Sequence, residues 1–144
     1  MDKNKYFMML AKDIAKGSTC PRNEVGCVLV DDAYRIIGTG YNGVPRNHPH
    51  CISTPCPRQN SDLPDGKGID TCHAIHAEQN ALMHCNDILK IKTVYTTDFP
   101  CFHCMKMLAN TSANLIVFKR GEPLREAVNF WKSVPDRYIL NLGE

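Results

Sequence analysis

The sequence of 144 residues has no long hydrophobic run, little excess charge of either sign and no internal repeat. Residues 6–11 form a short apolar run, whereas a membrane span needs about 18–20 apolar residues, and a secretory signal also needs a longer apolar core and a cleavage site. Lys and Arg total 17 against 15 for Asp and Glu, too small an excess for a protein that coats a polyanion. We therefore expect one domain over residues 1–144, located in the cytoplasm, with neither membrane nor nucleic acid as a partner.

Cysteine, by contrast, is plentiful. The chain has eight Cys and six His, and a disulfide framework of that size is more typical of shorter, secreted chains. Because no secretory signal is recognisable, we expect the thiols to stay reduced. Metal binding or catalysis is then their leading explanation.

Helical and extended patterns alternate along the chain. Three helices are predicted over residues 4–16, 77–89 and 100–111. A fourth is predicted to begin at Pro123 and to stop at Pro135. Pro100 and Pro123 are expected to be first helical residues, where proline is favoured. Strands are predicted over residues 25–30, 36–41, 93–97 and 115–118. The residues from 137 onward fit either a short strand or a tail. Because the first two strands form a hairpin, this order predicts a layered α/β domain with a mixed sheet.

One long stretch, residues 42–71, differs from the rest in composition. It holds five Pro, three Gly and two Cys, with few residues that could build a core. We interpret it as a single loop inside the domain. Structureless loops of this length are rare unless they are functional or fastened by another element.

Two short motifs carry the chemistry. H-A-E at residues 76–78 opens one predicted helix, and P-C-F-H-C at residues 100–104 opens the next. Cys101 and Cys104 are three residues apart, so they share a helix face, and in a first turn the helix dipole favours thiolates. With His76 they supply three ligands for tetrahedral zinc and leave one position for water, while Glu78 can move protons. H-x-E followed by P-C-x-x-C is the signature of zinc-dependent deaminases.

The chain resembles the cytidine-deaminase-like superfamily and, within it, the deoxycytidylate (dCMP) deaminases. The likeness covers about residues 5–120 and is carried by V-G-C-V-L-V at 25–30, G-Y-N-G-V-P at 40–45, H-A-E-Q-N-A-L at 76–82 and the 100–104 motif. The G-Y-N-G-x-P motif is what points to dCMP. The resemblance implies a three-layer α/β/α cytidine-deaminase-like fold with a mixed, about five-stranded central sheet. It also implies hydrolysis of dCMP to dUMP with release of ammonia, which supplies dUMP for thymidylate synthesis.

By this likeness, His76, Cys101 and Cys104 hold a catalytic zinc ion. Glu78 then moves a proton from water to the pyrimidine and on to the departing ammonia. The backbone of Ala77 faces the base.

Four further residues are candidates for binding the substrate. The resemblance implies that Asn42 contacts a sugar hydroxyl, although Asn-Gly is also a favoured turn pair. A phosphate needs a basic partner, for which Arg22 and Arg46 are both candidates. Phe99 can stack on the base or pack in the core.

A second, structural zinc would fasten the long loop, and some virus-encoded and bacterial dCMP deaminases resemble this chain in having one. Its four ligands are expected among five residues: Cys20, Cys51, Cys56, Cys72 and His73. The alternative is that these are free loop thiols. Cys27 and Cys85 are predicted to pack in the core.

The resemblance also implies a homohexamer that dCTP activates and dTTP inhibits, with Mg²⁺ accompanying an effector triphosphate. Other functions remain open. C-x-x-C at a helix start also suits a thioredoxin-like dithiol oxidoreductase, and a zinc-stapled module could bind ligands without catalysis. Within the deaminases, the substrate could be another cytosine or adenine compound.

Overall fold

The computed structural model describes residues 1–50 and 72–143. Within them, five strands form one sheet in the order β2-β1-β3-β4-β5. The strands are β1 (Gly26–Val30), β2 (Ile36–Tyr41), β3 (Thr93–Asp98), β4 (Leu115–Arg120) and β5 (Tyr138–Asn141). The helices are α1 (Lys3–Ala15), α2 (Ala77–His84), α3 (Phe102–Ala109), α4 (Arg125–Lys132) and the short 3-10 helix η2 (Ile88–Lys90). Across these described ranges, no helix combines the length and the apolar character that crossing a membrane requires.

The sheet is mixed, as predicted. β1 pairs antiparallel with both β2 and β3, whereas β3, β4 and β5 run parallel to one another. The end of the chain that could have been a tail is therefore a strand at the sheet edge. Because β3 and β4 are parallel, their carboxyl ends, at Asp98 and Arg120, lie side by side.

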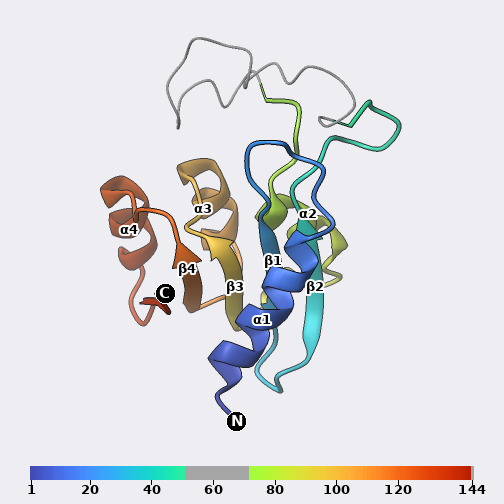
Figure 1. The fold of residues 1–144 in the computed structure, drawn as a ribbon. Coiled ribbons are helices and arrows are strands. Elements are labelled where there is room, and N and C mark those ends of the chain that lie inside the picture. The colour runs from blue at the N-terminus through green and yellow to red at the C-terminus, as the bar shows by residue number, and fades with distance from the viewer. Residues whose placement is uncertain (51–71, 144) are drawn as a thin grey trace.

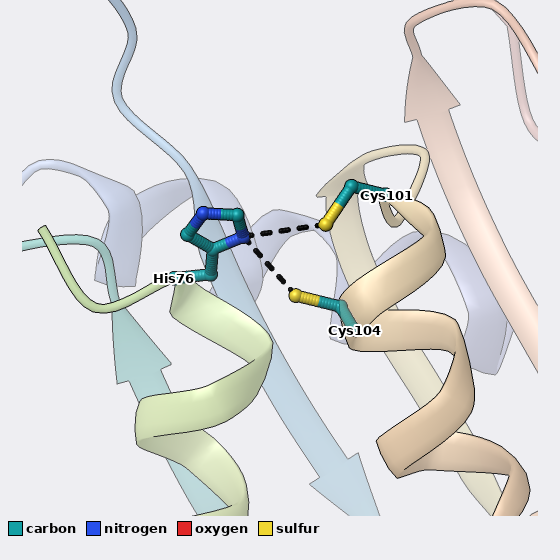
Figure 2. Close-up of side chains that lie close together, drawn as sticks. All are labelled: His76, Cys101 and Cys104. Atoms are coloured by element: carbon teal, nitrogen blue, oxygen red, sulfur yellow. Dashed lines mark hydrogen bonds between the residues drawn. The ribbon is translucent and has the colours of Figure 1, made fainter. Parts of the chain in front are cut away.

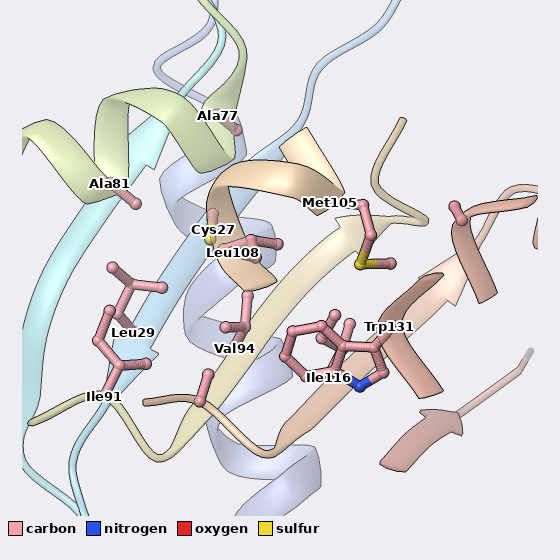
Figure 3. Packing of buried hydrophobic residues seen from close by; sticks show 12 residues of the cluster. Cys27, Leu29, Ala77, Ala81, Ile91, Val94, Met105, Leu108, Ile116 and Trp131 are labelled. Carbon is pink, nitrogen blue, oxygen red and sulfur yellow. The ribbon is translucent and has the colours of Figure 1, made fainter. Parts of the chain in front are cut away.

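Helices cover both faces of the sheet, which confirms the three-layer arrangement. α1 alone lies across one face, over β1, β2 and β3 (Figure 1). Its buried side chains pack there on those of the sheet: Phe7, Met8 and Ala11 against Val28, Val30, Tyr95 and Val117. The other face is covered by α2, α3 and α4, whose apolar residues surround Leu29, Val94 and Ile116 (Figure 3). Alternate residues of each strand thus enter different cores.

Three helix boundaries differ from the sequence-based expectation. α2 ends at His84 rather than near residue 89, because Cys85 turns to extended backbone and Asp87 caps the separate helix η2. Pro100 and Pro123 are not first helical residues, since Cys101 and Leu124 stand between them and their helices as N-caps. A proline fixes its own backbone torsion φ and favours an extended conformation at the residue before it, so the chain is extended where it approaches each N-cap.

Two glycines of β2 bring α2 against the strand without intervening side chains. A Cβ atom built on Gly40 would lie 2.4 Å from the backbone nitrogen of Ala81 and 2.5 Å from the carbonyl oxygen of Ala77. A Cβ atom on Gly38 would lie 2.8 Å from the carbonyl oxygen of Ala81. The amide of Asn80 also donates to the carbonyl of Tyr41 over 2.8 Å. The strand therefore sets the height and direction of α2.

Gly40→Ala is expected to lower the free energy of unfolding by about 3 kcal/mol, because no methyl group fits between the two backbones. Urea denaturation followed by circular dichroism measures this loss. Gly43→Ala is the control, because a Cβ atom at Gly43 would meet nothing closer than the Tyr41 ring at 4.0 Å. Equal stability of the two variants would contradict the packing described.

Candidate active site

Three metal-binding side chains meet where two neighbouring helices begin. His76 is the N-cap of α2, Cys101 is the N-cap of α3, and Cys104 lies in the first turn of α3 (Figure 2). The Nδ1 atom of His76 is 3.2 Å from the sulfur of Cys104 and 3.5 Å from that of Cys101. Within residues 1–50 and 72–143, this is the only group of three or more such residues that converges in this way.

The spacing of these atoms fits a zinc ion. All ligand atoms lie within 4.8 Å of one another. Zinc–nitrogen bonds of about 2.1 Å and zinc–sulfur bonds of about 2.3 Å, at tetrahedral angles, place nitrogen and sulfur about 3.6 Å apart. The two nitrogen–sulfur distances are close to that value. An imidazole with two thiolates is also a donor set that zinc prefers.

Local hydrogen bonds hold the ligands in place. The side-chain oxygen of Gln79 accepts from the backbone nitrogen of His76 over 2.9 Å. Just before it, Ile75 and Gly43 exchange two backbone hydrogen bonds, of 2.7 and 3.1 Å. In α3, the carbonyl of Cys101 accepts from the nitrogen of Met105 over 2.8 Å, so the first turn begins directly at the ligand. Neighbouring backbone and side-chain groups thus fix the positions of His76 and Cys101 at the starts of their helices.

The two thiols differ in their affinity for protons. A hydrogen bond from Cys104 lowers the pKa of Cys101 to about 4, and His76 contributes to this stabilisation of the thiolate. The pKa of Cys104 is raised, because its proton is held in that hydrogen bond and because the residue is buried. Cys101 is therefore readily ionised, whereas Cys104 is expected to lose its proton only when a cation is bound beside it.

Glu78 lies next to the three ligands but outside their cluster. It is buried, with 4% of its surface exposed, and it lines the same cavity as His76 and Cys101. Burial raises the pKa of its carboxyl to about 7, and the charge of His76 partly opposes this shift. Behind it, burial and the charge of Glu78 raise the pKa of Cys27. Cys27 belongs to the core, as predicted.

A cavity of about 920 Å³ opens over the site. Asn42, Ala77 and Phe99 line it together with His76 and Cys101. Ala77 is buried as the first residue of α2. Phe99 lines the cavity and packs edge-to-face on Phe118, at 5.1 Å between ring centres, so it has the expected core contact, while stacking on the base stays a prediction.

Asn42 forms two hydrogen bonds with the backbone, and its contact with a sugar hydroxyl stays a prediction. Its side-chain oxygen accepts from the backbone nitrogen of Val25 over 2.9 Å, and its amide donates to the carbonyl of Asn23 over 2.8 Å. These bonds hold the residues before β1. Arg22 lines the cavity, and Arg46 is not among its lining residues.

The candidates for the second zinc are only partly covered by the structure. Cys51 and Cys56 lie outside the described residues. Cys20 and Cys72 both line the cavity, whereas His73 is exposed and is not among the lining residues. Cys85 is half-buried beside the core.

Sequence reasoning did not identify a polar cluster at one wall of the cavity. Asp98 accepts hydrogen bonds from Arg120 and from Asn23. The only signal in the sequence was position: both Asp98 and Arg120 end a parallel strand, and the carboxyl ends of parallel strands commonly border a binding site.

The sequence model of the cytidine and deoxycytidylate deaminase zinc-binding region matches residues 1–120. The chain belongs to this family. The deoxycytidylate deaminase of Mycobacterium phage D29 is 37% identical over 125 residues, which are 83% of this chain and 95% of the phage protein. That of Saccharomyces cerevisiae is 35% identical over 125 residues, or 85% of this chain and 39% of the yeast protein. A third relative, the deoxycytidylate deaminase of Schizosaccharomyces pombe, is covered over 36% of its length. The chain therefore spans less than half the length of either yeast protein.

Two solved structures share the fold. The dCMP deaminase of cyanophage S-TIM5, in complex with dCMP and dUMP, has a TM-score of 0.75 at 22% identity, covering 96% of this chain and 95% of that chain. RibD of Acinetobacter baumannii has a TM-score of 0.63 at 23% identity, covering 96% of this chain and 35% of that chain. These likenesses confirm the deaminase-like fold expected from the sequence.

Cys104→Ser is expected to lower bound zinc by about one equivalent per chain, because a hydroxyl is a poor replacement for a thiolate ligand. Metal analysis of the purified protein measures this change. Cys85→Ser is the control and should keep its zinc, because Cys85 lies outside the cluster. Equal zinc contents in the two variants would contradict the assigned site.

Proposed function

We propose that this chain is a zinc-dependent deaminase that hydrolyses dCMP to dUMP and ammonia, and so supplies dUMP for thymidylate synthesis. The observation that carries the proposal is that Glu78 lines one cavity with His76 and Cys101, beside the cluster that these two residues form with Cys104. Family membership supports it, as does the phage relative that the chain covers almost completely.

His76, Cys101 and Cys104 would hold the metal. Zinc bound there supplies a Lewis acid that lowers the pKa of a water molecule toward neutrality. The N-terminus of α3 supports the two sulfurs, because its dipole favours negative charge. The burial of Cys104 keeps this side of the site away from bulk solvent.

Glu78 would be the group that moves protons. Its carboxyl would take one proton from the water whose oxygen adds to C4 and deliver it to ring N3 of cytosine. It would then carry the remaining hydroxyl proton to the amino group, which leaves as ammonia as the C4–N bond breaks and the C4 carbonyl forms. It is suited to this role because it lines the cavity beside the ligands without joining their cluster. A carboxylate at this point has no role in a purely structural zinc site.

The remaining lining residues would bind the nucleotide. Ala77 is small and leaves room for a flat base, and Phe99 offers an aromatic surface in the same cavity. Arg22 is our candidate for the phosphate, because it lines the cavity and a guanidinium pairs well with phosphate oxygens. Asn42 would orient the sugar side of the site from its place beside Val25.

A dithiol oxidoreductase fits these contacts less well. It would use Cys101 and Cys104, but it does not need the imidazole to lie at ligand distance from both sulfurs, 3.2 and 3.5 Å away. It would also leave the buried carboxyl of Glu78 without a purpose.

A second zinc ion is part of the proposal. Cys20 and Cys72 line one cavity although 52 positions separate them in the chain, which supports a shared ligand role. The other ligands would come from Cys51, Cys56 and His73. This ion would fasten the long loop near the site.

We also propose regulation by dCTP and dTTP, with Mg²⁺ bound to the effector, and assembly into a homohexamer in the cytoplasm. The G-Y-N-G-V-P motif supports the first, through its resemblance to the dCMP deaminases. Exposed apolar side chains support the second: Leu124 is 52% exposed and Phe130 is 41% exposed, at and near the two ends of α4.

Glu78→Gln is expected to lower kcat for dCMP by about a thousandfold, because the amide cannot carry protons, while zinc stays bound. The measurement is ammonia release from dCMP, dCTP, deoxycytidine and CMP, combined with metal analysis. Wild-type protein should prefer dCMP. Two zinc equivalents per chain would support the second site.

Glu126→Gln, at an exposed carboxyl of α4, is the matched control and should keep wild-type turnover. Unchanged turnover in Glu78→Gln would overturn the proposed mechanism. Full activity in metal-free protein would overturn the zinc-dependent reaction.

Arg22→Gln is expected to raise KM for dCMP about tenfold and to leave deoxycytidine turnover unchanged, because only the nucleotide carries a phosphate. Arg46→Gln is the control, since Arg46 is not among the residues lining the cavity. Steady-state kinetics on both substrates compare the variants. A larger effect from Arg46 would reverse the assignment.

A further inference from the structure

The last residue of β4, Arg120, lies behind the 920 Å³ cavity and contacts three residues that line it, Asn23, Asp98 and Phe99. Its backbone carbonyl accepts from the nitrogen of Phe99 over 3.0 Å, which extends the pairing of β3 and β4 beyond Asp98. Phe99 lies two residues before Cys101. The backbone of Arg120 therefore holds the turn that leads into the cysteine motif.

The side chain of Arg120 reaches residues 23 and 24, of which Asn23 lines the 920 Å³ cavity. Its Nε donates to one carboxylate oxygen of Asp98, and Nη2 donates to the side-chain oxygen of Asn23 over 3.0 Å and to the carbonyl of Glu24 over 2.6 Å. The amide of Asn23 donates to the other carboxylate oxygen of Asp98. The three side chains form a closed cycle of hydrogen bonds.

This cycle anchors residues 20–24, which we call the wall segment. The segment belongs to no helix or strand. Residues 20–23 line both the 920 Å³ cavity and a second cavity of about 670 Å³ on their other side. The carbonyl of Asn23 is also held by Asn42. Side chains, rather than a backbone ladder, hold this segment in position.

We propose that Arg120 is a positioning residue that holds the wall segment, and with it Arg22, at the distance from the cysteine motif that a nucleotide requires. Arg120 would act through Asn23 and Glu24 without touching the substrate itself. The role in substrate choice rests on the proposed deamination of dCMP. Arg120 thereby becomes a determinant of the preference for a nucleotide over a nucleoside.

Only a guanidinium can make all of these contacts. Its planar fork presents several donors in fixed directions, and here Nε and Nη2 bind three different residues. A lysine ammonium keeps the charge and can reach Asp98, but it lacks the geometry to bind Asn23 and Glu24 at the same time. Arg120→Lys therefore separates the charge of the residue from its shape.

The first test measures position without any substrate. Hydrogen–deuterium exchange at the amides of Val25 and Gly26, which follow the wall segment, should become about tenfold faster in Arg120→Lys. Exchange in β3 and α3 should stay unchanged. Arg35→Lys, at an exposed arginine in the β1–β2 turn, is the matched control and should behave as wild type. Unchanged exchange in Arg120→Lys would overturn the proposal.

The second test measures substrate choice. In Arg120→Lys, the ratio of kcat/KM for dCMP to that for deoxycytidine should fall about tenfold, with zinc content and deoxycytidine turnover kept. A parallel loss on both substrates, or an unchanged ratio, would overturn the role in selectivity. If wild-type protein releases no ammonia from dCMP, the proposed function fails, and the exchange experiment still decides the positioning role.

Asn23→Ala provides an independent variant, because it removes the link between the wall segment and the Asp98–Arg120 pair. It should lower the same ratio about tenfold. The double variant Asn23→Ala/Arg120→Lys should lose no more than either single variant, since both break one connection. Additive losses would show that the two residues act separately, which would contradict the proposal that they act through one cycle of hydrogen bonds.

Discussion

The close approach of α2 to β2 is the contact on which the site depends. Gly38 and Gly40 alternate along β2, so both face the helix, and the backbones meet there without side chains between them. That contact sets where α2 begins, and the helix begins at the metal-binding imidazole and the buried carboxyl. The start of α3 is positioned separately, by the parallel pairing of β3 and β4. The site lies where the starts of α2 and α3 come together.

The composition of the site favours a bound cation. Two thiols and a carboxyl surround one imidazole, and two of the four residues, Cys104 and Glu78, are buried. Such an excess of acidic groups in a poorly solvated place is unfavourable when they ionise together. A divalent ion stabilises the ionised groups by its charge, and this attraction contributes to the free energy of metal binding. Core packing alone would favour apolar residues at these positions.

Sequence patterns predicted the mixed sheet, the order of elements and the zinc cluster, because each rests on local signals of periodicity or spacing. The starts of α3 and α4 were each wrong by two residues, since an N-cap between proline and helix leaves the apolar pattern unchanged. The cycle of Asn23, Asp98 and Arg120 was not predicted. Its members are far apart in the chain, and their meeting depends on strand order, which periodicity does not determine. Asn42 shows the same limit: its motif was recognised, but its backbone partners were not.

The two-bond bridge between Gly43 and Ile75 has an evolutionary consequence. The two bridge residues are adjacent in space although 31 positions lie between them in the chain. Doubling the length of a flexible insert costs only about 0.6 kcal/mol of closure free energy. Such a point of attachment lets new sequence be added or exchanged while the framework that carries the imidazole keeps its geometry.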